Sequence, residues 1–555
     1  MDISALINPT ATAAMNALKA SLSRSPTGRG YSAISNDSKA ELITAGSHAP
    51  GSRFVPRRLL RLSTKGLFLL VCAVLTLPGV LFTMLLKGHG RYYGRTPVPF
   101  DTHRRLQIIL PCNEPSTNLC KSVSSALALG FPAPVIVNWG KDYQGGGWHA
   151  GSHLDKIIGT IDYLDWAVSP NATGPNALRD SDLVVVADST DTWFQLPADV
   201  LIKRYYEANE QAKERYAEQW LGKGEVPMEQ TIIVSTQKKC FPPRQSGSIL
   251  HCDSLPQSPM REDLYGNVTD KDPLRYTKNR PRYLNSGSMI GPVGDMRRYF
   301  HRVRARMDEL QDKGTHLYSD QGIFAEILAE QEIFRQQLRR REEWDDASIG
   351  MFQEELEYHV GLDYTQKLFI PTVFEEEDGE IITLNNETHI QKASQQRGIY
   401  PARLHGVPDD IKNATNPLQS LGGEDAFNWG ELPLYADYYT RAIPVIVHHN
   451  AHKDGAKARR YKWWDRTWFF PHLRALLNAR IAAEKPWRLS TVQLPQGEVV
   501  YTALETYDVN PKPRLYKQGQ GIEEASFEAV CRTWSPEDGE KMWYDEMFRD
   551  RRGPL

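Results

Sequence analysis

Two aspartates and a histidine have the residue types and the sequence context of a metal site. Asp188 and Asp191 follow the apolar run VVVA, and His448 follows the apolar run IPVIV much later in the chain. Carboxylate oxygens bind hard divalent cations, and a neutral imidazole is a frequent further ligand. A cation held there can neutralise a diphosphate and stabilise it as it leaves. In the alternative, Asp188 caps a turn, Asp191 is solvated and the histidine is a hydrogen-bonded core ring.

Further polar groups stand in segments that can approach a ligand. Asn285 lies in YLNSGSMIG, where small residues let the backbone come close to a bound molecule, or else mark a bulge. Asp320 and Gln321 open a helical pattern, so Asp320 is either an N-cap or a group that faces a sugar or acts in catalysis. Lys453 follows His448 closely and can contact phosphate oxygens.

The sequence HKD at 452–454 also matches half of a non-haem iron triad. The remaining ligand would be a distant histidine, and the only later one is His472, 18 residues on. This spacing argues against an iron oxygenase.

Alternating apolar runs and longer amphipathic runs must position these groups. Strands are predicted at 106–111, 132–139, 182–188, 231–236 and 443–449, and helices at about 153–166, 197–220 and 320–341. This alternation indicates an α/β fold with a mostly parallel sheet flanked by helices, in which ligands bind beyond the carboxyl ends of strands. Residues 342–380 read as acidic and loop-rich with short strands. Residues 481–555 show no clear period and are interpreted as a C-terminal extension.

The charge balance excludes a nucleic-acid-binding class. Lysine and arginine total 66 against 68 aspartate and glutamate, which gives a formal net charge of −2. Such a chain has no global field for a polyanion, and no basic cluster with interleaved aromatics stands out. Six cysteines form no CxxC metal pair.

Residues 66–86 predict one transmembrane helix. They form a 21-residue run without a charge, which is long enough to span a bilayer. A cleaved signal peptide would start nearer residue 1, and a buried helix is rarely apolar all round. Five basic residues precede the run and three follow it, namely Arg53, Arg57, Arg58, Arg61, Lys65, Lys87, Arg91 and Arg95. This bias favours a cytoplasmic N-terminus, with residues 1–65 as a disordered tail and 87–105 as a stem.

N-glycosylation sequons agree with that topology. Four of them follow the apolar run, at Asn171, Asn267, Asn386 and Asn413. Together with the basic flank they predict a single-pass type II glycoprotein of the Golgi or endoplasmic reticulum with a luminal catalytic region. In that oxidising lumen Cys240 and Cys252, which bracket a Pro- and Ser-bearing loop, are the preferred disulfide. The pairing of Cys112, Cys120 and Cys531 stays open.

An ordered set of motifs resembles a known family. The segments are ADSTDTWF, CFPP, YLNSGSMIG, SDQGIF, GLDYTQKLF and PVIVHHNAHK, spread over roughly residues 106–455. They resemble the glycosyltransferase domain of procollagen lysyl hydroxylases and related procollagen glycosyltransferases. The resemblance implies a GT-A fold over 106–480, a bound Mn²⁺ and a UDP-sugar donor.

The resemblance also implies roles for individual residues. Asp188 and Asp191 match the carboxylate ligands of the metal, and His448 matches the histidine ligand. Because side chains alternate along a strand, His448 and His449 cannot both face one ion from regular β structure. The remaining matches are donor-binding or catalytic: Asn450 and Lys453 in the phosphate-contact stretch, Asn285 in the asparagine-serine-glycine strand, Asp320 and Gln321 at the end of an aspartate run near sugar and acceptor, and Lys156 as a donor-side lysine.

The sequence departs from the family at three places. The aspartate run is shortened to Ser319-Asp320, His449 replaces a glycine, and the C-terminal iron domain of the hydroxylases is missing. Lysyl hydroxylation is therefore not predicted. The leading hypothesis is a metal-dependent glycosyltransferase that acts on a glycan or glycoprotein, with Asp320 as the candidate catalytic base. A carbohydrate-binding or scaffolding protein with the same fold and a metal-dependent hydrolase are the alternatives.

Overall fold

The structure is a computed structural model whose described residues lie in the unit Pro97–Leu555. They are residues 100–142, 152–222, 224–272, 275–340, 350, 353, 355–422, 428–451, 456–483, 488–502, 511–532 and 542–555. The predicted tail, the apolar run 66–86, most of the predicted stem and Lys453 lie outside these ranges. Among the described residues no helix is both long and apolar enough to cross a membrane.

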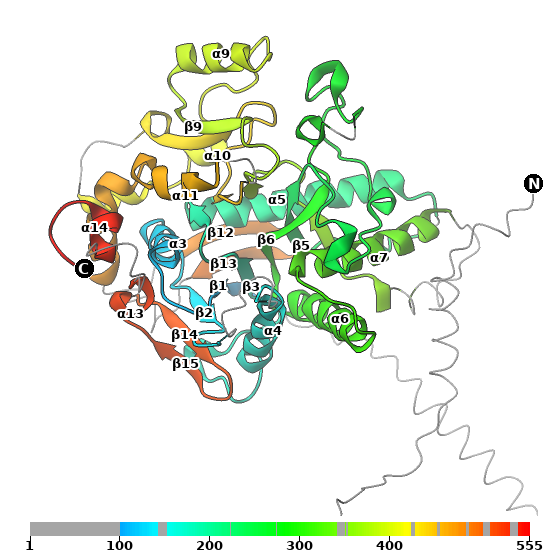
Figure 1. Ribbon diagram of the computed structural model, residues 1–555, viewed down its shortest axis with the longest axis horizontal. Coiled ribbons are helices and arrows are strands. Elements are labelled where there is room, and N and C mark those ends of the chain that lie inside the picture. Colours follow the sequence, from blue (N-terminus) through cyan, green and yellow to red (C-terminus); the bar gives the residue numbers. More distant parts are fainter. Residues whose placement is uncertain are drawn as a thin grey trace, which may run out of the picture. The chain divides into compact units, whose positions relative to one another are not determined.

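A mixed ten-stranded sheet forms the centre of the unit (Figure 1). Its main path runs through β15 (Gly521–Glu524), β14 (Arg514–Lys517), β2 (Val135–Val137), β1 (His103–Pro111), β3 (Leu183–Ala187), β6 (Tyr283–Pro292), β5 (Ile232–Gln237) and β7 (Val360–Leu362), while β13 (Gly497–Thr502) pairs with β1 and β12 (Arg488–Leu494) with β13. The four strands from β14 to β3 are parallel. The prediction of a largely parallel α/β sheet is confirmed there, but β6 runs antiparallel to both of its neighbours.

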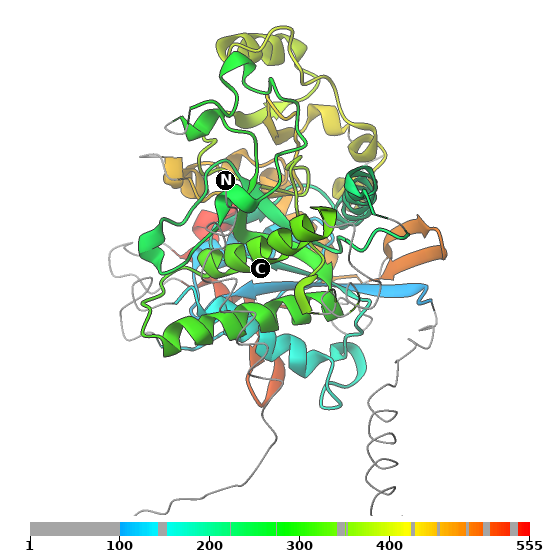
Figure 2. The ribbon, with the colours of Figure 1, turned by 90° about the vertical axis from the view of Figure 1, so that its right-hand side faces the viewer.

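The two faces of the sheet bury different side chains. Ile108 and Val185 pack with one apolar cluster, which includes α3 (Thr117–Ala128) and α5 (Ala198–Gln219). Their neighbours Ile109 and Val184 pack with the other cluster, which includes α4 (Asp155–Ala167), α6 (Val293–Asp312) and α7 (Asp320–Arg340). Strand side chains alternate, so a continuous run such as LVVVA serves both faces at once. Figure 2 shows α6 and α7 side by side in green.

The C-terminal part of the chain joins this sheet. Residues 488–524 supply β12, β13, β14 and β15, although their sequence predicted no element that attaches to the core. A disulfide between Cys120 on α3 and Cys531 on α13 (Phe527–Cys531) ties the region down further. The predicted disulfide Cys240–Cys252 is confirmed, and Cys112 is a buried free thiol.

A small second sheet carries the late histidine. β4 (Thr192–Phe194), β11 (Ile446–His448) and β8 (Phe369–Pro371) form a three-stranded sheet in which β11 is central. β11 runs antiparallel to β4 and parallel to β8, and His448 is opposite Thr192. Because β4 begins one residue after Asp191, this pairing brings His448 to the turn that holds both aspartates.

The remaining elements surround these two sheets. β9 (Gly379–Thr383) and β10 (Pro433–Asp437) form an antiparallel pair. The other α-helices among the described residues are α9 (Glu387–Gln396), α10 (Asp409–Lys412), α11 (Arg459–Lys462), α12 (Leu473–Ile481) and α14 (Trp543–Phe548).

A buried charged cluster fills the space beside β10. Lys238 is fully buried and forms an ion pair with Asp378, while its Nζ lies 3.9 Å from Glu375. Asp437 lies in the same cluster, where its Oδ1 accepts hydrogen bonds from the backbone of Tyr439 and from Thr440. Burial raises the pKa of Asp437 to about 6, and the Asp378 carboxylate adds to this effect. Between about pH 4 and pH 6, Asp437 in the folded chain therefore keeps a proton that an ordinary aspartate has lost.

Candidate metal centre

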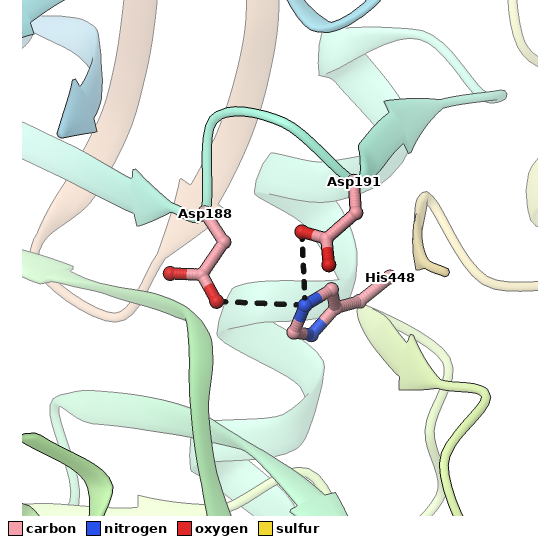
Figure 3. Close-up of side chains that lie close together, drawn as sticks. All are labelled: Asp188, Asp191 and His448. Carbon is pink, nitrogen blue, oxygen red and sulfur yellow. Dashed lines mark ion pairs between the residues drawn. The ribbon is translucent and has the colours of Figure 1, made fainter. Parts of the chain in front are cut away.

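The two aspartates stand on a tight turn between β3 and β4 (Figure 3). Thr192 Oγ1 donates to the carbonyl of Asp188, and Ser189 Oγ donates to the carbonyl of Pro111 at 2.7 Å. The backbone N–H of Asp188 donates to Gly287 on β6 at 2.9 Å. The turn is thus fixed to the ends of β1 and β6, and both carboxylates remain partly exposed.

His448 reaches the same point from β11. Its Nε2 lies 3.4 Å from Asp188 Oδ2 and 3.2 Å from Asp191 Oδ1, and the residue is 4% exposed. One ligand atom from each of the three residues lies within 4.8 Å of the others (Figure 3). Two carboxylate oxygens and an imidazole nitrogen at this separation suit a divalent cation. The three residues predicted as ligands are therefore brought together.

A hydrogen-bond chain sets the orientation of the imidazole. The N–H of Gly287 donates to Asn285 Oδ1 at 3.1 Å, and Asn285 Nδ2 donates to Gln237 Oε1 at 2.8 Å. Asn285 Oδ1 is therefore an acceptor, and it lies 3.3 Å from His448 Nδ1. An acceptor at Nδ1 favours a proton on that nitrogen, so Nε2, which faces the carboxylates, is the ring nitrogen that could bind a cation. Asn285, predicted to bind the donor, orients the histidine.

A bulge in β6 makes room for the ring. The register against β5 jumps from Met289, opposite Val234, to Asn285, opposite Ser235. The segment between them passes close to His448, so that a Cβ at Gly287 would lie 2.1 Å from His448 Cε1 and 2.2 Å from Nδ1. Only glycine permits this approach. The bulge considered from the sequence is present, and it is part of the metal centre.

Lys156 and Asp320 form a buried pair behind the turn. Lys156 Nζ lies 2.7 Å from Asp188 Oδ1 and 2.7 Å from Asp320 Oδ2, and it also donates to the carbonyl of Ser286 at 3.1 Å. Burial acts to lower the pKa of Lys156, but the two carboxylates outweigh it and raise that pKa. Burial likewise acts to raise the pKa of Asp320, and Lys156 outweighs it and lowers that pKa. Lys156 and Asp320 are therefore both charged. The Lys156 ammonium also forms an ion pair with Asp188 and so holds that carboxylate in place.

A cavity of about 720 Å³ opens in front of the cluster. It is lined by seven of the predicted site residues: Asp188, Asp191, Asn285, Asp320, Gln321, His448 and Asn450. Gln321 also ties β6 to the Phe241 loop, because its Nε2 donates to Phe241 at 2.7 Å and its Oε1 accepts from Ser286 at 3.3 Å. Asn450 Oδ1 accepts from the N–H of Val373 at 3.1 Å. Both residues help to hold the cavity wall in place.

Several lining residues were missed in the sequence. They are His153, Gln237, Phe241, Phe374 and Arg460. Phe241 belongs to the CFPP segment, whose resemblance was noted without a role. Arg460 stands in the basic run RRYK, which is typical of a solvated helix face and gave no signal.

His449 lies on the other side of β11. Its ring centroid is 4.1 Å from that of Trp193, and the residue is 2% exposed. Burial lowers the pKa of His449 to about 3, so the ring is neutral at physiological pH. The alternation predicted for the two histidines is what the strand shows, with His448 at the carboxylates and His449 in an aromatic pocket.

Comparisons with known proteins do not identify a family for this chain. No family model matches the chain, and no curated protein matches it. Among solved structures, the galactosyltransferase LgtC in complex with donor and acceptor sugar analogs matches over 64% of this chain and 94% of its own. The identity is 11% and the TM-score is 0.25, which is too low to transfer any property of LgtC to this chain.

Proposed function

We propose that this chain is a metal-dependent glycosyltransferase that transfers a sugar from a UDP-sugar to a glycan or glycoprotein. The observation that carries the proposal is the set of three candidate metal ligands, Asp188, Asp191 and His448. They line a cavity that is large enough for a nucleotide-sugar. The family resemblance of the surrounding motifs supplies the donor class.

The residues of the site have separate roles that suit this reaction. A divalent cation bound by the three ligands would bind the diphosphate oxygens and stabilise the diphosphate as it leaves. Lys156 fixes the Asp188 carboxylate at 2.7 Å and balances the charge of Asp320. Asn285 turns the His448 lone pair toward the cation position. Each contact is made by the protein alone, so the ligand set is already ordered before the donor enters.

Asp320 is best suited to orienting a hydroxyl. It lines the cavity as the first residue of α7, and Ser286 Oγ donates to its Oδ2 at 2.8 Å. Its lowered pKa makes it a weak proton acceptor, although it remains a good hydrogen-bond acceptor. We therefore propose that Asp320 positions the donor sugar or the acceptor hydroxyl.

The proposed compartment is the lumen of the Golgi or endoplasmic reticulum, with the chain anchored as a type II membrane protein. The predicted span supports this topology, and so do the sequons. All four sequon asparagines, Asn171, Asn267, Asn386 and Asn413, are solvent-exposed, as glycan attachment requires.

A donor screen tests the proposed reaction. The full chain in detergent is incubated with a panel of nucleotide-sugars, Mn²⁺ and candidate acceptors, and nucleoside diphosphate release is followed. We expect release that needs the metal, increases with an acceptor and is lost in Asp188→Asn. Glu210→Gln, which removes a 62%-exposed carboxylate on α5, is the matched control and should stay active.

The alternatives predict different results. Release that no acceptor increases would identify a hydrolase, and release from no donor would leave a binding or scaffolding protein.

A further inference from the structure

One arginine of the cavity wall has no counter-ion among the residues that the structure describes. Arg460 is the only lysine or arginine among the described residues that line the cavity. No carboxylate in the described part of the chain lies within ion-pair distance of its guanidinium, and its Nε has no acceptor there. Lys156, the buried cation beside the metal centre, is by contrast paired with Asp188 and Asp320. A cavity that keeps an unpaired guanidinium suits an anionic ligand.

The fold holds Arg460 in a defined position. It lies on α11, and its carbonyl accepts a hydrogen bond from Lys121 Nζ at 3.2 Å. Lys121 is itself buried and forms an ion pair with Glu546. The guanidinium carbon of Arg460 lies 4.9 Å from the ring centroid of Tyr461, which restricts the side chain further.

The neighbouring arginine has a different role. Arg459 donates to the carbonyl of Glu376 and packs over the ring of Trp463 at 4.5 Å. Arg459 is absent from the cavity wall. On this short helix only Arg460 is directed to the cavity.

The charge balance of the site explains why a further positive group such as Arg460 would be needed to bind a diphosphate. A divalent ion would be balanced by Asp188 and Asp191, and Lys156 is already shared with Asp320. A nucleoside diphosphate therefore adds negative charge that the described metal site does not balance. We propose that Arg460 binds a phosphate group of the donor, with its planar fork making paired hydrogen bonds to the oxygens. This inference rests on the proposed function, because it takes a diphosphate as the ligand of the cavity.

Calorimetry on the full chain in detergent tests the proposal. UDP and uridine are titrated separately, with Mn²⁺ and with chelator, into the wild type, Arg460→Gln and Arg460→Lys. Loss of a charge-assisted contact should weaken UDP binding about ten- to hundredfold in Arg460→Gln. Arg460→Lys should recover part of the loss, because it restores the charge and not the fork. Uridine binding should be the same in all three proteins.

The matched control is Lys462→Gln, which removes an exposed positive charge from the same helix. Its UDP affinity should equal that of the wild type, and thermal unfolding should show that every variant is folded. If the wild type binds UDP and Arg460→Gln binds it no more weakly than Lys462→Gln does, the assignment of Arg460 is wrong. The proposed function would stand in that case. If the wild type binds no nucleoside diphosphate with or without Mn²⁺, both proposals fail.

Discussion

Substitution of Gly287 by alanine should disable the metal centre without removing a ligand. A Cβ at this position would lie 2.1 Å from His448 Cε1 and 2.2 Å from Nδ1. The backbone of Gly287 is held on both sides, because its carbonyl accepts a hydrogen bond from the N–H of Asp188 at 2.9 Å and its N–H donates to Asn285 Oδ1 at 3.1 Å. The imidazole must therefore move.

The size of the movement determines the effect on metal affinity. An ordinary carbon contact is about 3.5 Å, so relief from 2.1 Å shifts the ring by about 1.4 Å. Protein ligands to a metal tolerate deviations of about 0.2 Å. The alanine variant should thus bind Mn²⁺ at least about tenfold more weakly, within the range seen when the support of a ligand is lost.

The assay is a titration of free Mn²⁺ by electron paramagnetic resonance, with the protein in excess over the metal. Ser288→Ala is the control on the same strand: it removes a hydroxyl that donates to the Gly287 carbonyl at 2.7 Å, and it should retain wild-type affinity. In His448→Ala the ring is gone, so adding Gly287→Ala should cause no further loss. Unchanged Mn²⁺ affinity in Gly287→Ala, or additive losses in the double variant, would refute the reasoning.

Three further predictions concern the histidine pair, a buried acid and the topology. His448→Ala should weaken Mn²⁺ binding at least about tenfold, whereas His449→Ala should keep the affinity and lower the thermal stability; the reverse pattern would place the wrong histidine at the metal. Because the pKa of Asp437 is raised to about 6, the free energy of unfolding should fall as pH rises from about 4 to about 6. Asp437→Asn should flatten that part of the profile in urea unfolding, and an unaltered slope would contradict the assignment. In sealed microsomes, added protease should spare residues 87–555 and an endoglycosidase should lower their apparent mass; digestion without detergent would exclude the type II topology.

The predictions that succeeded depend on local sequence. The run LVVVA gives a buried strand by itself, so the place of Asp188 at its carboxyl end follows from a few residues. The alternation of side chains likewise separates His448 from His449 once a strand is assumed. Helices α5 and α7 were predictable because their apolar period extends over many turns.

The parts that failed depend on partners far along the chain. Nothing near Gly287 reveals that a histidine from residue 448 packs against it, since the contact arises from a bulge in β6. The short strand β14 is recognisable only beside β2, where Arg514 is buried against Gln107. Arg460 looks like one more charge on a solvated helix until the cavity beside it is seen. Pairing between distant segments is set by tertiary contacts, which local propensity does not contain.

The binding of UDP as a function of Mn²⁺ tests the central claim most directly. Calorimetry on the full chain should show UDP binding that requires the metal and disappears with chelator. Asp191→Asn, which keeps the size of the side chain and removes a charged ligand, should lose this binding while remaining folded. UDP binding that is equally strong with and without Mn²⁺, or that survives in Asp191→Asn, would contradict the account.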